Sequence, residues 1–196
     1  MEFDQKQNNQ TIAALLLAAV ATQAVYTLMY VAAKDLPRTW LWSVEGLLFV
    51  LLAAFGGAAL VQAKRYALGY AAIFASAILN VVQVGIGLTQ FGAFREAVQS
   101  VDGLAPAAGS VVALSFFIYN AAKVLLGLSA VAIGSALMAQ GAKLLGRLAM
   151  FVGSAAFLTN AVVMMFGRIE GVPSGATGVV ATLLLALCLL KLRYDD

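Results

Sequence analysis

The sequence predicts an all-α integral membrane protein, a single domain built as a bundle of about six transmembrane helices. Apolar residues make up 63% of the chain and charged residues 11%, whereas soluble domains are about half apolar and about a quarter charged. The apolar residues also form runs of the length, about 20 residues, that a helix needs to cross a bilayer. The excess apolar surface must therefore face lipid.

The predicted spans are continuous runs rich in Ala, Leu, Val and Gly, and they cover residues 11–33, 41–62, 66–91, 111–139, 144–167 and 175–192. A β-barrel is disfavoured because barrel strands are short and alternate apolar with polar residues. The polar leading segment carries Glu2 and Asp4 beside Lys6, unlike the basic start of a signal peptide. We therefore expect the first span to persist as a helix.

The basic residues lie mainly at span ends, where they orient a membrane protein. Seven are expected on the side of the two termini: Lys6, Lys64, Arg65, Lys143, Arg147, Lys191 and Arg193. Four are expected on the other side: Lys34, Arg38, Arg95 and Arg168. This bias predicts cytoplasmic termini in a membrane of the bacterial inner (plasma) membrane type. Without a basic stripe, the net charge of +3 does not indicate a nucleic-acid partner.

The longest outer segment, residues 91–110, has an amphipathic pattern. Its apolar residues recur at helical spacing, with polar and charged residues between them: Phe91, Phe94, Val98 and Val101 against Arg95, Glu96, Gln99 and Asp102. We expect a helix along the outer membrane interface, ended by Gly103 and Pro106. It would be either a lid over a pocket or a connector resting on lipid headgroups.

A weak internal repeat relates two predicted hairpins. Residues 56–62 align with residues 134–140 at an offset of 78, and one residue fewer in the turn then aligns Leu68 and Gly69 with Leu145 and Gly146. This would pair the hairpin of spans 2 and 3 with that of spans 4 and 5, as in the parallel repeats of some transporters. In so Ala-rich a sequence, chance alignment is the alternative.

Two full charges lie within the predicted spans, Glu45 in the second and Lys123 in the fourth. A charge at mid-bilayer costs about 3 kcal/mol on insertion scales, so it usually pairs or faces an aqueous cavity. The two positions correspond across the repeat, which places them at one depth and predicts an ion pair. The alternative for Glu45 is solvation at the outer surface, because Trp40 and Trp42 suit an interfacial belt.

Uncharged polar and aromatic residues collect at a similar depth in the outer half of the spans. Together with the two charges they form the predicted ligand site: Glu45, Lys123, Asn80, Gln83, Asn120, Asn160, Tyr26 and Tyr119. The alternative is that the amides are hydrogen-bonding links between helices. The inner half is predicted to be dry, with close helix packing at small residues: Gly56, Gly57, Ala130 and Gly134.

The composition disfavours several kinds of chemistry. The chain has no His and one Cys, Cys188, so the usual ligands for zinc, haem and iron–sulfur clusters are lacking. We predict no metal site, no cofactor and no catalytic residues, and enzyme activity has no support in the sequence. The leading hypothesis is a small-solute binding or transport protein in the bilayer. The alternatives are a non-catalytic subunit of a larger membrane complex, with a membrane-protein or homo-oligomeric partner, and a membrane enzyme acting on a lipid.

The topology prediction can be tested by labelling a single cysteine. In a Cys188→Ala background, Ser100→Cys should react with a membrane-impermeant maleimide added outside intact cells, because residues 91–110 are expected outside. A cysteine replacing Lys6 is the control and should react only after the membrane is opened. Labelling of position 100 only from the cytoplasm would reverse the orientation.

Overall fold

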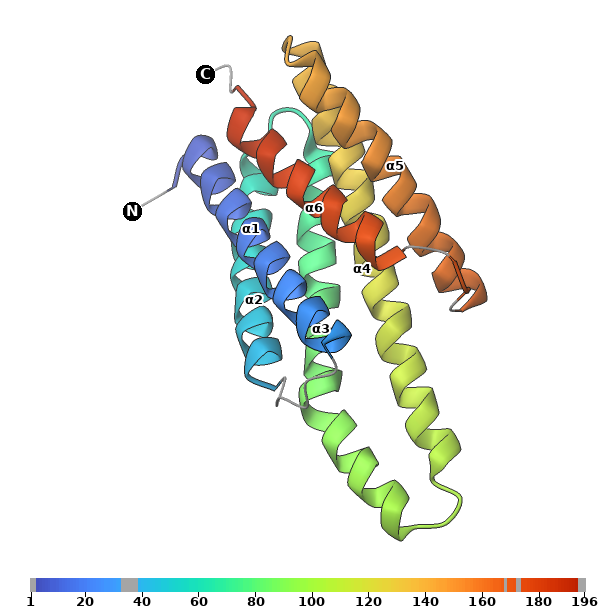
Figure 1. Cartoon of the computed structure of the whole chain (residues 1–196). Helices are drawn as coiled ribbons and strands as arrows, with labels where there is room; N and C mark the ends of the chain where they lie inside the picture. Colours follow the sequence, from blue (N-terminus) through green and yellow to red (C-terminus); the bar gives the residue numbers. More distant parts are fainter. Residues whose placement is uncertain (1–2, 33–38, 168, 172–173, 194–196) are drawn as a thin grey trace.

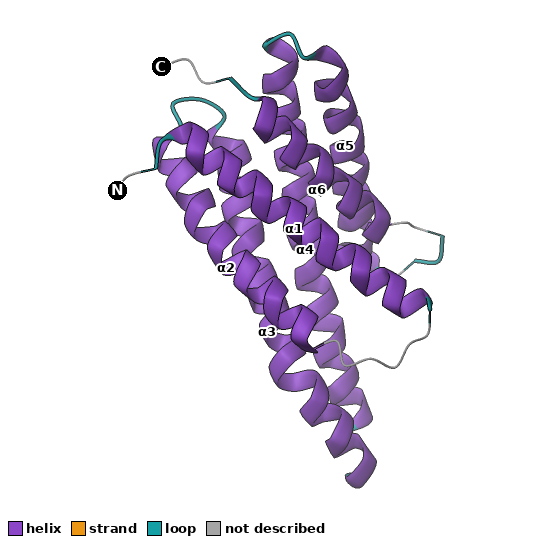
Figure 2. Ribbon diagram, turned by 60° about the vertical axis from the view of Figure 1, so that its left-hand side comes forward, coloured by secondary structure: helices purple, strands orange, loops and turns teal. Residues whose placement is uncertain are grey.

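The computed structural model describes residues 3–32, 39–167, 169–171 and 174–193. These residues form helices and no strand. The helices are α1 (Gln5–Val31), α2 (Thr39–Gln62), α3 (Ala67–Ser100), α4 (Ala105–Ala139), α5 (Lys143–Phe166) and α6 (Ser174–Lys191). All six are long and apolar enough to cross a membrane. The predicted fold class is confirmed (Figures 1 and 2).

The helices form two layers. In the back layer α2, α3, α4 and α5 stand side by side in chain order, each packed on the next. In the front layer α1 packs on α2 and on α6, and α6 also packs on α4 and α5. Helices α1 and α6 both run obliquely across the back layer (Figure 1). Both ends of the described chain lie at one end of the bundle, here called the terminal end, and the α3–α4 turn lies at the opposite, hairpin end.

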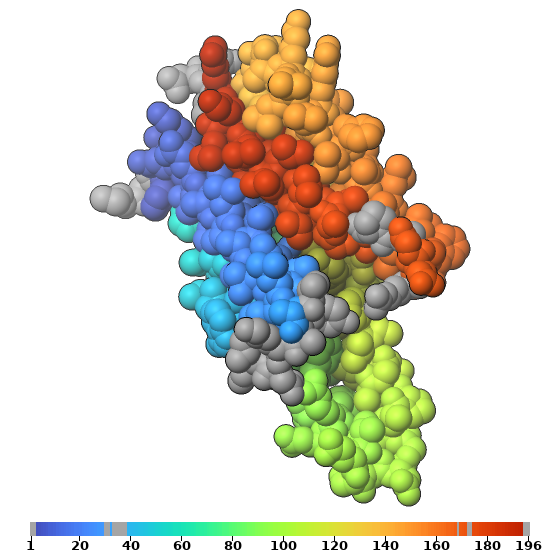
Figure 3. Space-filling view, viewed as in Figure 1, coloured from blue at the N-terminus to red at the C-terminus, as the bar shows by residue number. Residues whose placement is uncertain are grey.

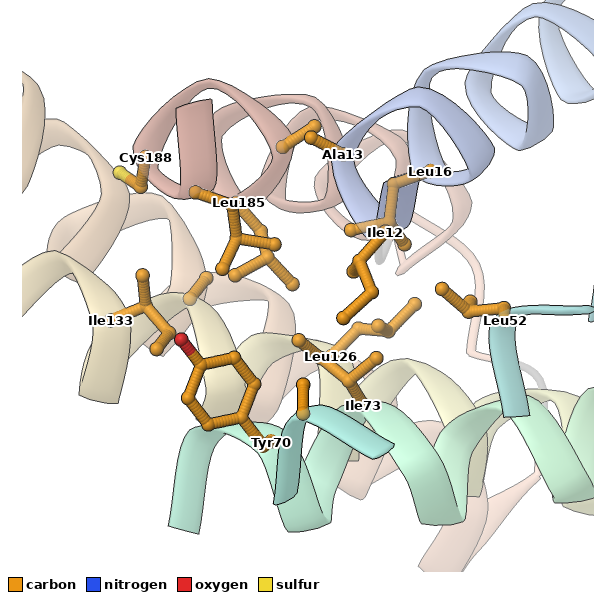
Figure 4. Close-up of a cluster of buried hydrophobic side chains, with 14 of the residues drawn as sticks. Ile12, Ala13, Leu16, Leu52, Tyr70, Ile73, Leu126, Ile133, Leu185 and Cys188 are labelled. Atoms are coloured by element: carbon orange, nitrogen blue, oxygen red, sulfur yellow. The ribbon is translucent and has the colours of Figure 1, made fainter. Parts of the chain in front are cut away.

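The apolar core lies between the two layers. Its largest members come from five helices and are at most 1% exposed: Ile12 and Leu16 of α1, Leu52 of α2, Tyr70 and Ile73 of α3, Leu126 of α4 and Leu185 of α6. These side chains converge in Figure 4. Large side chains are needed here because the backbone of α1 does not come close to that of α3 or α4 in the described residues.

The α4–α5 contact is built differently, from two reciprocal pairs of glycines, Gly127 with Gly153 and Gly134 with Gly146. A Cβ atom at Gly127 would lie 2.7 Å from the carbonyl oxygen of Gly153, and one at Gly146 would lie 2.6 Å from that of Gly134. No side chain fits at such distances, so glycine allows the two backbones to touch. The predicted close packing at Gly134 is confirmed.

The α3–α4 hairpin is longer than the sequence suggested. α3 has 34 residues and α4 has 35, which gives rods about 50 Å long against a hydrocarbon core of about 30 Å. The hairpin extends well beyond the other helices (Figures 1 and 2). The prediction of a separate helix along the interface, ended by Gly103 and Pro106, is wrong. Residues 91–100 continue α3 without a break, Val101 ends it in an extended conformation (φ −125°), and Pro106 lies in the first turn of α4.

α1 begins at Gln5, earlier than the predicted residue 11. The backbone N–H of Gln7 donates to the Asp4 carboxylate at 2.7 Å, and the backbone N–H of Asp4 donates to the Gln7 side chain at 3.0 Å. This is a reciprocal capping box, which satisfies free N–H groups at a helix start. The polar residues before the apolar run are therefore part of the first helix.

The helix boundaries agree with the predicted repeat at the terminal end. The turn between α2 and α3 covers residues 63–66 and that between α4 and α5 covers 140–142, which accounts for the one-residue change in offset. At the hairpin end the correspondence fails, because α3 has 34 residues and α5 has 24. Any repeat therefore relates only the terminal parts of the two hairpins.

The glycine contact predicts opposite effects for the same substitution at two positions. Gly127→Ala should destabilise the bundle by about 1–3 kcal/mol, since overpacking forces backbones apart. Gly85→Ala should be neutral or stabilising, because a Cβ there meets nothing within 4 Å and Ala is the better helix former. Thermal unfolding in detergent measures both. Equal effects would show that the close α4–α5 approach does not limit stability.

Candidate functional site

Lys123 crosses the bundle from the back layer to the front layer. It lies on α4 and is 1% exposed. Its methylene stem passes α6 at Gly178, where an added Cβ would lie 3.0 Å from the Lys123 Cδ. Its Nζ donates a hydrogen bond to Gln23 Oε1 of α1 at 3.0 Å and lies 5.3 Å from the centre of the Tyr119 ring. The ammonium group is thus held by a neutral amide and an aromatic face.

Glu45 is buried on α2, with 8% of its surface exposed. The hydroxyl of Thr22 on α1 lies 2.8 Å from Glu45 Oε1 and 2.9 Å from the carbonyl oxygen of Ala19. A threonine hydroxyl has one hydrogen, so it can satisfy only one of these acceptors at a time. Burial contradicts the alternative that Glu45 is solvated at the surface.

The predicted ion pair between Glu45 and Lys123 is not formed among the described side chains: the two charges bind consecutive residues of α1, Thr22 and Gln23. The reason is the order of the back layer. α3 lies between α2 and α4, and neighbouring helix axes are about 8–10 Å apart. The axes of α2 and α4 are therefore about two helix widths apart, and the two side chains reach α1 from different helices.

Asn80 and Gln83 lie on the face of α3 that packs on α4. The Asn80 amide donates to the Ser76 carbonyl at 2.9 Å, and the Ser76 hydroxyl donates to the Ala122 carbonyl of α4 at 2.9 Å. The Gln83 amide donates to the Ser115 hydroxyl at 3.3 Å. The Gln83 amide therefore links two helices directly, as the alternative interpretation holds, whereas the Asn80 amide bonds within α3 and Ser76 makes the link to α4.

Asn120 and Asn160 each use the nitrogen of the side-chain amide in hydrogen bonds but leave the oxygen without one. The Asn120 amide donates to the Phe116 carbonyl at 2.7 Å, and the Asn160 amide donates to the carbonyls of Ala156 at 2.8 Å and Ser174 at 3.2 Å. The Oδ1 atom of each is buried with no hydrogen-bond partner among the described residues. Such orphaned acceptors are uncommon in folded proteins.

The two tyrosines of the predicted ligand site, Tyr26 and Tyr119, have different neighbours. Tyr26 stacks on Trp42 with ring centres 6.3 Å apart, and Trp42 meets Phe91 edge-on at 5.8 Å. Tyr119 lies beside the Lys123 ammonium. Trp42 is therefore packed between α1 and α3, toward the hairpin end from Glu45, whereas Trp40 is exposed.

Two surface hollows of about 320 and 560 Å³ lie at the α4–α5 turn, at the terminal end. Neither is lined by a residue of the predicted ligand site.

The residues of the predicted ligand site are only partly brought together. Glu45, Lys123 and Tyr119 lie toward α1, whereas Asn160 lies on the α5–α6 side. In the described part of the chain, no three His, Cys, Asp or Glu side chains gather as a metal would require.

A second polar cluster, at the terminal end, was missed by sequence reasoning. The buried Asn8 and Asn9 of α1 donate to Gln62 Oε1 at 2.6 Å and to the Tyr70 hydroxyl at 2.8 Å. The side-chain N and O of Gln5 are buried without a partner among the described residues. The terminal half of the bundle is therefore not uniformly apolar. The Asp4–Gln7 capping box was the sequence signal that these residues belong to a helix.

Comparison of the chain with protein-family models, with curated proteins and with solved structures finds no match.

The geometry predicts strong coupling between Gln23 and Lys123. Gln23→Leu should destabilise the protein by about 1–3 kcal/mol, because the buried ammonium loses its acceptor. In a Lys123→Met background the same change should cost much less, since no charge is left to satisfy. Thermal unfolding of the two single variants and the double variant measures the coupling. Additive effects would show that the hydrogen bond does not hold α1 in place.

Proposed function

We propose that this multi-pass membrane protein binds or transports a small polar solute between α1 and the face of the back layer that carries Glu45 and Lys123. One observation carries the proposal. Two buried, oppositely charged side chains reach the same segment of α1, and each is held there by a neutral side chain instead of by the other charge.

Neutral partners are weak compensation for charges inside a bilayer. Hydrogen bonds between two charged groups are shorter and stronger than those to an amide or a hydroxyl. A solute carrying an anionic group could replace Gln23 at the Lys123 ammonium, and a donor group on the same solute could replace Thr22 at Glu45. The chemistry therefore favours a zwitterionic or otherwise bipolar solute of a few ångströms in length.

The packing of α1 supports entry from the hairpin end. In the terminal part of α1, Ile12, Ala13, Leu16 and Ala19 are buried in the core. Beyond Gln23 the helix is largely exposed, with Val25 at 42% and Leu28 at 69%. Local opening is easiest where few apolar contacts are lost, so this part of α1 could move aside while its terminal part stays docked.

A non-catalytic subunit of a larger membrane complex is the second candidate, and the α3–α4 hairpin favours it. The hairpin projects beyond the other helices (Figure 2) and exposes apolar side chains over its length: Val98, Val101, Val112, Leu114 and Phe116. A helix of a partner subunit could replace lipid as the cover of these side chains. A purified protein that is stable only with a co-purifying partner would favour this candidate.

Ligand-dependent thermal shift in detergent tests the solute site. A panel of amino acids, simple carboxylates and simple amines should contain at least one compound that raises the unfolding temperature of the wild-type protein. Lys123→Met should abolish that shift, because it removes the charge that binds the anionic group.

Gln62→Leu is the control for this experiment. It breaks hydrogen bonds of α1 at the terminal end and should lower stability while leaving the ligand-induced shift intact. A shift that survives in Lys123→Met, or a panel without any effect on the wild-type protein, would refute the proposed site.

A further inference from the structure

A basic hollow opens at the terminal end, where the end of α6 meets the α4–α5 turn. Its volume is about 320 Å³, and it is lined by Leu137, Gln140, Gly141, Ala142, Lys191 and Arg193. The space-filling view shows the two elements side by side at this end of the molecule (Figure 3). The hollow therefore combines two cationic side chains with a partly apolar wall.

Gln140 fixes the position of Arg193 at this hollow. Its amide donates to the Arg193 carbonyl at 2.8 Å, and its carbonyl accepts the Arg193 backbone N–H at 2.8 Å. This two-point contact ties the segment that follows α6 to the residue that follows α4. Arg193 is exposed and lines the hollow, and only its backbone takes part in the contact with Gln140.

A second, more apolar hollow of about 560 Å³ adjoins the first and shares Gly141 and Ala142 with it. The rest of its lining is Lys143, Leu144, Leu145 and Leu148 of α5. Leu144 is 75% exposed and Leu148 is 45% exposed. This second hollow, called the furrow below, thus continues the cationic hollow onto exposed leucines at the start of a membrane-spanning helix.

We propose that the two hollows together bind one anionic phospholipid. The phosphate would lie between Lys191 and Arg193, with Lys143 beside it, and an acyl chain would follow Leu144 and Leu148. Guanidinium groups suit phosphate oxygens because they present paired donors. Basic pockets between membrane helices at the headgroup level are a recurring site for anionic lipids. The apolar furrow distinguishes a lipid from free phosphate, and the proposal does not depend on the solute site.

Native mass spectrometry of the purified full-length protein tests this lipid site. Phosphatidylglycerol and phosphatidylcholine with identical acyl chains serve as the anionic and zwitterionic probes. The wild-type protein should retain one phosphatidylglycerol in preference to phosphatidylcholine. Lys191→Gln with Arg193→Gln should weaken that retention about tenfold or more. The Gln140 contact should persist in this variant, since it uses only the backbone of residue 193.

The matched control is Lys64→Gln with Arg65→Gln, which removes two exposed cations from the α2–α3 turn at the same end. It should retain the lipid as the wild-type protein does. Equal loss in both variants would indicate unspecific surface charge and would overturn the proposal, as would equal retention of the two lipids. Displacement of the lipid by glycerol phosphate at comparable concentration would also overturn it, because the furrow would then contribute nothing.

Discussion

The lack of water inside a bilayer means that every buried polar group must find its partner within the protein. In this bundle α1 supplies the partners of the two buried charges. It meets Glu45 and Lys123 with Thr22 and Gln23, and two further polar contacts join it to α2 and α3 at the terminal end. Its position across the back layer therefore depends on hydrogen bonds at two levels, with apolar packing between them.

The bundle contains two kinds of helix contact, and they differ in how easily they can change. The α4–α5 contact brings backbones together at Gly127 and Gly153, so any displacement would lose many close contacts at once. The gap between α1 and the back layer is filled by long side chains such as Lys123, which can adopt other rotamers. A site that opens and closes is better placed in this second kind of contact.

The sequence predicts the number of helices and the close packing at Gly134 well, because hydropathy and residue size act locally along the chain. It does not predict the partner of Lys123, because that partner depends on the order in which the helices pack side by side. The ion pair of Glu45 with Lys123 was predicted from their common depth, which does not specify neighbouring helices, and α3 separates α2 from α4. The polar residues Asn8 and Asn9 were missed because a helix was expected to begin with its apolar run.

The repeat also suggests why α1 and α6 lie where they do. Gln62 and Gln140, equivalent in the predicted repeat, each bind the backbone of a chain end, at Phe3 and at Arg193. Glu45 and Lys123 also occupy corresponding positions of the predicted repeat, and both reach α1. α1 packs on α2 and α6 packs on α4, the first helices of the two hairpins, although α6 also packs on α5 while α1 does not pack on α3. Because a carboxyl group occupies one of the equivalent positions and an ammonium group the other, α1 meets an acceptor on one side and a donor on the other, which is the asymmetry that a bipolar solute would require.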